Sequence, residues 1–225
     1  MSFWLYFALL FIIFMIIQIV NQQTIDKLFK QGDYEKLENR FKKMLSGAMS
    51  NSTIAYAYQN LIIIYMETNR YNEAHECINK VKELGFRNSV ILSLNESALL
   101  VKESRFDDAE AVINNCLKYK HLNKQYKVLL LNNLVNVMIN TNRVSEAKNM
   151  LDDLLKEYPT NTSLLATLGD FYMAQNDFSS AKEAYNKSLQ YPDNKIHGFS
   201  HVQYVKKQLD LINTKLVGQA LPDKN

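Results

Sequence analysis

A pattern of polar, large apolar and small positions recurs five times along the chain. Each copy begins with two polar or glycine residues, continues with a large apolar residue, and closes three positions later. The closing residues are Leu37, Ala74, Ala109, Ala147 and Ala181. Successive closing residues lie 37, 35, 38 and 34 positions apart. A period of this length predicts a helical solenoid.

The residues around each closing position share one face of a helix. In the fourth copy, Val144 stands three residues before Ala147 and Leu151 stands four residues after it. Upstream, Leu134 and Met138 are themselves four residues apart, which places them on one face of an earlier helix. The pattern therefore predicts pairs of helices, in which each pair covers the apolar surface of the next.

Two copies carry the residues of a known repeat. The last copy contains Leu168-Gly169, Tyr172, Ala181, Tyr185 and Pro192, and the copy before it contains Leu131, Leu134, Ala147, Leu151 and Pro159. Over roughly residues 24–217 the chain resembles the tetratricopeptide repeat family. The resemblance implies an all-α fold, a right-handed α-solenoid of helix pairs, in which the first helices line a concave groove for protein or peptide partners.

The spacing divides the solenoid into units. We expect a partial unit at 24–54, full units at 55–89, 90–127, 128–161 and 162–195, and a capping helix at 199–217. The capping helix is indicated by an apolar stripe, formed by Val202, Val205, Leu209, Ile212 and Leu216. Residues 218–225 are expected to form a short tail.

The N-terminal segment is apolar on every side. Residues 3–20 contain no charged side chain and one amide, Gln18. As a helix this run is about 27 Å long, close to the hydrocarbon thickness of a bilayer. It predicts a transmembrane anchor over residues 1–23, in contact with the lipid bilayer through residues 3–20. There are two alternatives. A cleaved signal peptide would have a basic start and a small-x-small cleavage site, and this segment has neither. The segment could instead be a buried helix of the solenoid.

The charges beside this segment predict its orientation. No Lys or Arg precedes the apolar run, whereas six basic residues follow it: Lys27, Lys30, Lys36, Arg40, Lys42 and Lys43. Because basic residues flank the cytoplasmic side of membrane spans, we expect a single-pass cell-membrane protein with a cytoplasmic solenoid.

The composition of the chain bears on its partners and on its fold. The formal net charge is +3, from 26 basic and 23 acidic residues, which is too balanced to favour nucleic acid. Two cysteines, Cys77 and Cys116, do not indicate a disulfide framework. The scarcity of Gly (6) and Pro (3) favours long helices.

A ladder of amides marks the candidate groove. The position fourteen residues before the closing residue is Asn in three copies and Thr in the last, and two neighbouring asparagines extend the set: Asn60, Asn95, Asn133, Thr167, Asn132 and Asn136. Carboxamides hydrogen-bond the backbone of an extended peptide. The alternative is that they make hydrogen bonds within the solenoid. Basic residues that clamp a C-terminal carboxylate in some family members are missing here.

No catalytic motif is present. The chain lacks the phosphate-loop, nucleophile-elbow and zinc-protease signatures, so we expect no enzyme activity, no catalytic residue, no cofactor and no small-molecule substrate. His197 and His201 are four residues apart, but no third metal ligand lies near them in sequence.

The sequence therefore predicts a membrane-tethered scaffold that binds protein or peptide partners in the groove. The alternative is a structural subunit of a membrane complex that assembles through its transmembrane helix.

Overall fold

The chain folds into α-helices stacked in sequence order. A computed structural model describes residues 3–191 and 201–220, without the side chains of 3–10, 13, 14, 17, 18, 201 and 216–220. Over these residues the helices are α1 (Phe3–Gln31), α2 (Tyr34–Gly47), α3 (Asn51–Glu67), α4 (Tyr71–Glu83), α5 (Val90–Lys102), α6 (Phe106–Leu117), α7 (Lys124–Asn140), α8 (Val144–Glu157), α9 (Thr162–Ala174), α10 (Phe178–Gln190) and α11 (His201–Ala220).

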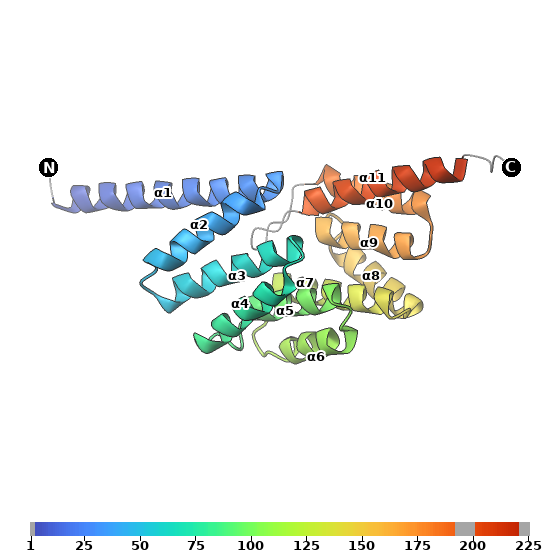
Figure 1. Ribbon diagram of the computed structural model, residues 1–225, viewed down its shortest axis with the longest axis horizontal. Coiled ribbons are helices and arrows are strands. Elements are labelled where there is room, and N and C mark those ends of the chain that lie inside the picture. The colour runs from blue at the N-terminus through green and yellow to red at the C-terminus, as the bar shows by residue number, and fades with distance from the viewer. Residues whose placement is uncertain (1–2, 192–200, 221–225) are drawn as a thin grey trace.

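The helices form two layers that curve together (Figure 1). The first helices of the pairs, α3, α5, α7 and α9, contact one another in succession. Buried residues occur around most of α3, whereas α4 buries only Ala74, Cys77, Ile78 and Val81. An amphipathic helix with one buried stripe belongs at the surface. The first helices are therefore the inner layer, and the predicted all-α helical-repeat solenoid is confirmed.

One residue in the left-handed conformation ends the first helix of each pair. The five residues concerned have φ between 57° and 68°, and they open the five copies of the sequence pattern: Gly32, Asn69, Ser104, Asn142 and Asn176. The N–H of the following residue then donates to a carbonyl five residues back, as from Arg70 to Tyr65 at 2.8 Å and from Arg143 to Met138 at 2.9 Å. This backbone pattern ends a helix while satisfying its last carbonyls.

The closing residue of each copy packs where the two helices of a pair meet. Leu37, Ala74, Ala109, Ala147 and Ala181 are all fully buried, each with a relative exposure of 0%. An alanine side chain lets two helix backbones approach closely, and the fixed turn before it sets their crossing. The predicted apolar stripe on the second helix is also confirmed, because its members four residues later are buried: Phe41, Ile78, Ile113, Leu151 and Tyr185.

Charged residues connect neighbouring pairs on the outer side. The Arg70 guanidinium, at the start of α4, lies 2.7 Å from the Glu38 carboxylate on α2. Two pairs later the same contact recurs between Arg143 and Glu110, at 2.6 Å. Each pair of this kind stabilises by up to about 1 kcal/mol, so they adjust the stacking that the apolar core determines.

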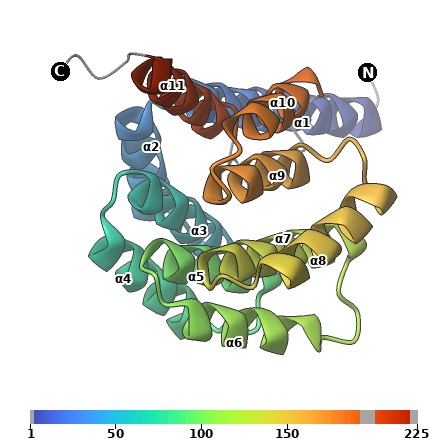
Figure 2. The same ribbon diagram turned by 90° about the vertical axis from the view of Figure 1, so that its right-hand side faces the viewer.

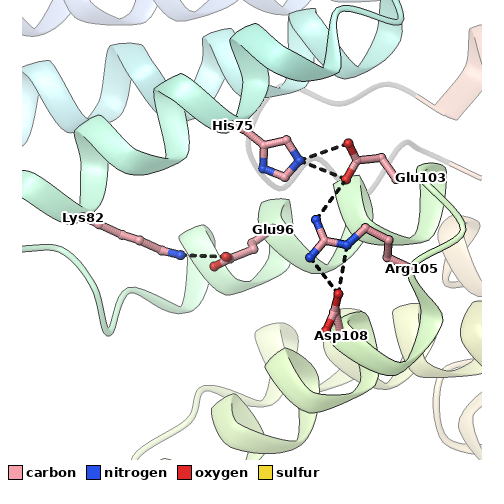
Figure 3. A network of polar contacts seen from close by, with 6 residues as sticks. All are labelled: His75, Lys82, Glu96, Glu103, Arg105 and Asp108. Atoms are coloured by element: carbon pink, nitrogen blue, oxygen red, sulfur yellow. Dashed lines mark hydrogen bonds and ion pairs between the residues drawn. The ribbon is translucent and has the colours of Figure 1, made fainter.

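A related network connects α4 to α5 (Figure 3). Nε2 of His75 lies 3.0 and 2.9 Å from the two carboxylate oxygens of Glu103, and Arg105 lies 3.8 Å from the same carboxylate. About two turns away along the same helices, Lys82 pairs with Glu96 at 2.6 Å. Both contacts cross from one repeat to the next and add to the packing that the apolar core determines.

The N-terminal prediction is wrong. Among the residues that the structure describes, no helix is both long enough and apolar enough to span a membrane. The predicted transmembrane anchor at 1–23, the membrane localisation and the cytoplasmic orientation derived from it are therefore corrected. The prediction rested on the apolar run at residues 3–20, which in the structure is part of one helix that continues to Gln31 and buries Ile25 and Phe29 against the solenoid. Residues 1 and 2 lie outside the described part.

The last helix closes the superhelix. On α11, Val205 and Ile212 are fully buried, and the helix packs on α9 and α10. It also contacts α1, where the Gln203 amide donates to the Lys30 carbonyl at 2.6 Å. Figure 2 shows the resulting arrangement, with the first and last helices, α1 and α11, in contact and the other helices curving between them. Residues 221–225 of the expected tail lie outside the description.

An aspartate holds α9, α10 and α11 together. Oδ1 of Asp170 accepts hydrogen bonds from the hydroxyls of Tyr185 and Tyr204, at 2.6 and 2.5 Å. Burial raises the pKa of Asp170, and the two hydroxyl donors oppose that rise only in part. The carboxylate is therefore an electrostatically unfavourable group at a junction of three helices.

Gly169 is expected to be intolerant of a side chain. A Cβ at this position would lie 2.7 Å from Cζ of the fully buried Tyr185 ring and nearer still to the ring edge. Because the ring is held by its hydrogen bond to Asp170, Gly169→Ala should destabilise the fold by about 1–3 kcal/mol and lower Tm by about 2–4 °C per kcal/mol. Gly47→Ala is the matched control, since its Cβ meets nothing within 4 Å. An equal effect of both changes on Tm would contradict this packing.

The pH dependence of stability should reflect Asp170. Its pKa in the folded chain is raised above the ordinary value of 3.8. As the pH rises above about 4, the unfolded chain releases this proton first, so the wild type loses stability. Asp170→Asn keeps an acceptor for both tyrosines and removes the titration. The difference in Tm, variant minus wild type, should therefore increase as the pH is raised from about 4 to about 7. A constant or falling difference would contradict the assignment.

Candidate functional site

The inner layer lines a partly open cavity of about 570 Å³. Its walls come from α3, α5, α7 and α9, and α11 contributes Tyr204 and Gln208. Residues up to 145 positions apart in sequence, such as Ile63 and Gln208, therefore line one space. We call this space the inner cavity. Its position follows from the fold, because the first helices of successive pairs face inward and α11 returns to contact α1 (Figure 2).

Apolar side chains form a large part of the wall. They come from every inner helix, and include Ile63, Ile91, Leu94, Leu129, Ala166 and Met173. Leu94 and Ala166 are buried, with relative exposures of 9% and 5%. An apolar cavity with a few polar groups is the usual form of a protein binding site.

Five of the six predicted groove residues line the cavity. They are Asn95, Asn132, Asn133, Asn136 and Thr167. Asn60 does not belong to the lining; its side-chain amide donates to the Tyr56 carbonyl of its own helix at 2.8 Å, and the residue is 3% exposed. The sequence pattern thus brings most of the set to one place.

Two of these asparagines connect inner helices to one another. The Asn95 amide donates to the Gln59 carbonyl on α3 at 3.2 Å. The Asn133 amide donates to the Ser97 hydroxyl on α5 at 2.9 Å. The same position in successive repeats therefore bonds to the helix before it, which is the alternative that the sequence left open. These bonds stabilise the wall of the cavity.

The other two asparagines retain hydrogen-bonding capacity. Asn132 is 8% exposed, and its Oδ1 is the only buried side-chain oxygen or nitrogen of the described residues without a partner. The Asn136 side-chain amide makes no hydrogen bond to other described residues, and the residue is partly exposed. A buried acceptor without a donor is unfavourable, so the cavity favours a molecule that supplies one.

The charged residues of the cavity were missed by sequence reasoning. Glu67 and Lys102 pair at 3.3 Å, and Asp170 lies on α9 next to Gly169. An acidic residue at an inward position of an apolar helix was a signal available in the sequence, since acids are rarely buried without a role. The contribution of Tyr204 could not be foreseen, because it depends on how α11 packs.

The structure offers little for metal or thiol chemistry. In the described ranges, no group of three His, Cys, Asp or Glu residues could hold a metal ion; His197 and the His201 side chain lie outside them. Cys77 and Cys116 are free and buried. Burial raises the pKa of the Cys77 thiol to about 12, which leaves almost no thiolate at neutral pH.

Comparison with known proteins agrees with the geometry. Residues 143–197 match the tetratricopeptide repeat family. No curated protein matches the chain. A tetratricopeptide repeat protein from Parabacteroides merdae ATCC 43184 is 17% identical with a TM-score of 0.63, over 84% of this chain and 70% of the other.

Two further solved structures have the same fold. PilF of Pseudomonas aeruginosa is 14% identical with a TM-score of 0.54, over 88% of this chain and 89% of the other. PilW, a widely conserved type IV pilus biogenesis factor, is 13% identical with a TM-score of 0.56, over 89% of this chain and 92% of the other. At these identities the likeness is one of fold alone. Residues 143–197 therefore match the tetratricopeptide repeat family, and the described helices as a whole share the helical-repeat fold of these solved structures.

Proposed function

We propose that the chain is an interaction scaffold that binds an extended segment of a partner protein in the inner cavity. The observation that carries this proposal is the cavity itself, which crosses four successive inner helices and combines apolar walls with amide groups. The helical-repeat scaffold of this family is typical of protein–protein interaction. The proposal assigns binding to the chain, with no turnover and no cofactor.

An extended peptide suits the chemistry of this wall. Its backbone presents one donor and one acceptor per residue, and each needs a partner when water is displaced. Asn132 and Asn136 carry side-chain amides able to supply both kinds of group, and both line the cavity. Apolar side chains of the segment would contact Ile91 and Leu129, which lie on the neighbouring helices α5 and α7.

The remaining predicted residues would act by positioning the wall. Asn95 and Asn133 hold α5 to α3 and α7 to α5, so the contact groups keep their spacing before a partner arrives. A preorganised site binds more tightly because less freedom is lost on association. Thr167, on α9, extends the same row toward Asp170.

Filling the cavity should abolish binding. Ala98 lines the cavity on α5 and is partly exposed, so Ala98→Phe places a ring where the segment would lie. The full chain is presented with a random library of short peptides, and affinities for the selected peptides are measured by fluorescence anisotropy. We expect Ala98→Phe to weaken them at least about tenfold, or roughly 1.4 kcal/mol.

The control makes the same substitution on the outer layer. Ala111 is exposed on α6, and Ala111→Phe should leave the affinities unchanged. Circular dichroism and Tm of both variants establish that the fold is retained. Equal affinities of the Ala98→Phe variant and the wild type would place peptide binding outside the cavity, and a wild-type chain that selects no peptide would contradict the proposed function.

A further inference from the structure

The inner cavity contains a carboxylate without a cationic partner. Three charged residues line it, namely Glu67, Lys102 and Asp170. Glu67 and Lys102 pair with each other. In the part of the chain that the structure describes, no Lys, Arg or His forms an ion pair with Asp170, and only its Oδ1 accepts hydrogen bonds. The net charge of the lining is therefore −1, and the charge that is not balanced is that of Asp170.

This arrangement is unfavourable for the chain on its own. Asp170 is partly exposed, and a carboxylate that is even partly removed from water needs hydrogen bonds and an opposite charge to offset its lost hydration. The hydroxyls of Tyr185 and Tyr204 supply hydrogen bonds but no charge. In agreement, burial raises the pKa of Asp170 despite these two donors. A cation in the cavity would balance the charge of Asp170 and offset its lost hydration.

A second group in the same cavity also lacks a donor. Oδ1 of Asn132, on α7, is buried and has no hydrogen-bond partner among the described residues. Asn132 and Asp170 lie on neighbouring inner helices, α7 and α9, that contact each other. Asn132 and Asp170 both lack a hydrogen-bond donor, and Asp170 also lacks a positive charge beside it.

We infer that the inner cavity recognises a lysine or arginine side chain of the bound segment, with Asp170 as the partner of its charged end. This inference rests on the proposed function and specifies its ligand. A basic side chain brings only donors at its tip, five in arginine and three in lysine. Its aliphatic stem suits the apolar wall, where Met173 lies on the same helix as Asp170. Asn132 accepts a further hydrogen bond from the segment.

The experiment changes the charge on either side of the contact. The probes are short acetylated and amidated peptides selected from the library by the full chain. Each is compared with a version in which arginine is replaced by citrulline, which keeps the shape and loses the charge. On the protein side, Asp170→Asn keeps an acceptor for both tyrosines. Asp153→Asn is the control, because Asp153 is exposed on α8 outside the cavity.

The expected result is a preference that depends on Asp170 alone. The selected peptides should be enriched in arginine or lysine, and citrulline should weaken their binding to the wild type about tenfold or more. The Asp170→Asn variant should bind the arginine and citrulline versions with similar affinity. The Asp153→Asn variant should keep the wild-type difference.

Other results would overturn the inference in distinguishable ways. If the wild type binds both peptide versions equally, or if the arginine preference survives in Asp170→Asn, the ligand assignment is wrong and the scaffold function stands. If the wild type selects no peptide, both fail. The citrulline comparison uses unaltered protein, so it decides the question even if Asp170→Asn does not fold.

Discussion

The backbone turn that ends each inner helix is the constraint on which the rest of the structure depends. A single left-handed residue, occupied by Gly, Asn or Ser, stops the helix, and the next N–H returns to a carbonyl five residues back. Most side chains make this conformation unfavourable, whereas glycine and asparagine adopt it readily. Because the same turn joins the two helices of every pair, the pairs stack in the same order, and the stack forms a curved solenoid with an inner face.

Some polar side chains of the inner face are hydrogen-bonded within the chain, and others are not fully so. Asn95 and Asn133 use their amides to join successive inner helices, whereas Asn132 and Asp170 face the same cavity without full partners. A solenoid can tolerate this because its stability is spread over many apolar interfaces, as the buried closing residues indicate. Asn132 and Asp170 are therefore the wall residues whose hydrogen bonding a ligand can complete.

The sequence predicted the period, the helix pairs and the buried positions, since these follow from spacing alone. Asn69 could have been identified as a helix-ending residue from its place after an apolar helix. The direction of the asparagine side chains could not, because residues at adjacent positions, Asn132 and Asn133, serve different purposes. Nor could spacing reveal that α11 reaches both α1 and Asp170. The N-terminal prediction was wrong because the length and composition of one apolar run do not show what the helix that contains it packs against, and the end of α1 packs on the solenoid.

The most direct test of the account is to locate a selected peptide on the full chain. A photoreactive group at the centre of the peptide is activated in the complex, and the attachment sites are identified by mass spectrometry. The account predicts attachment to residues of the inner helices, such as Ile63, Leu94, Leu129 and Ala166. Attachment confined to the outer helices α4, α6 and α8 would contradict it.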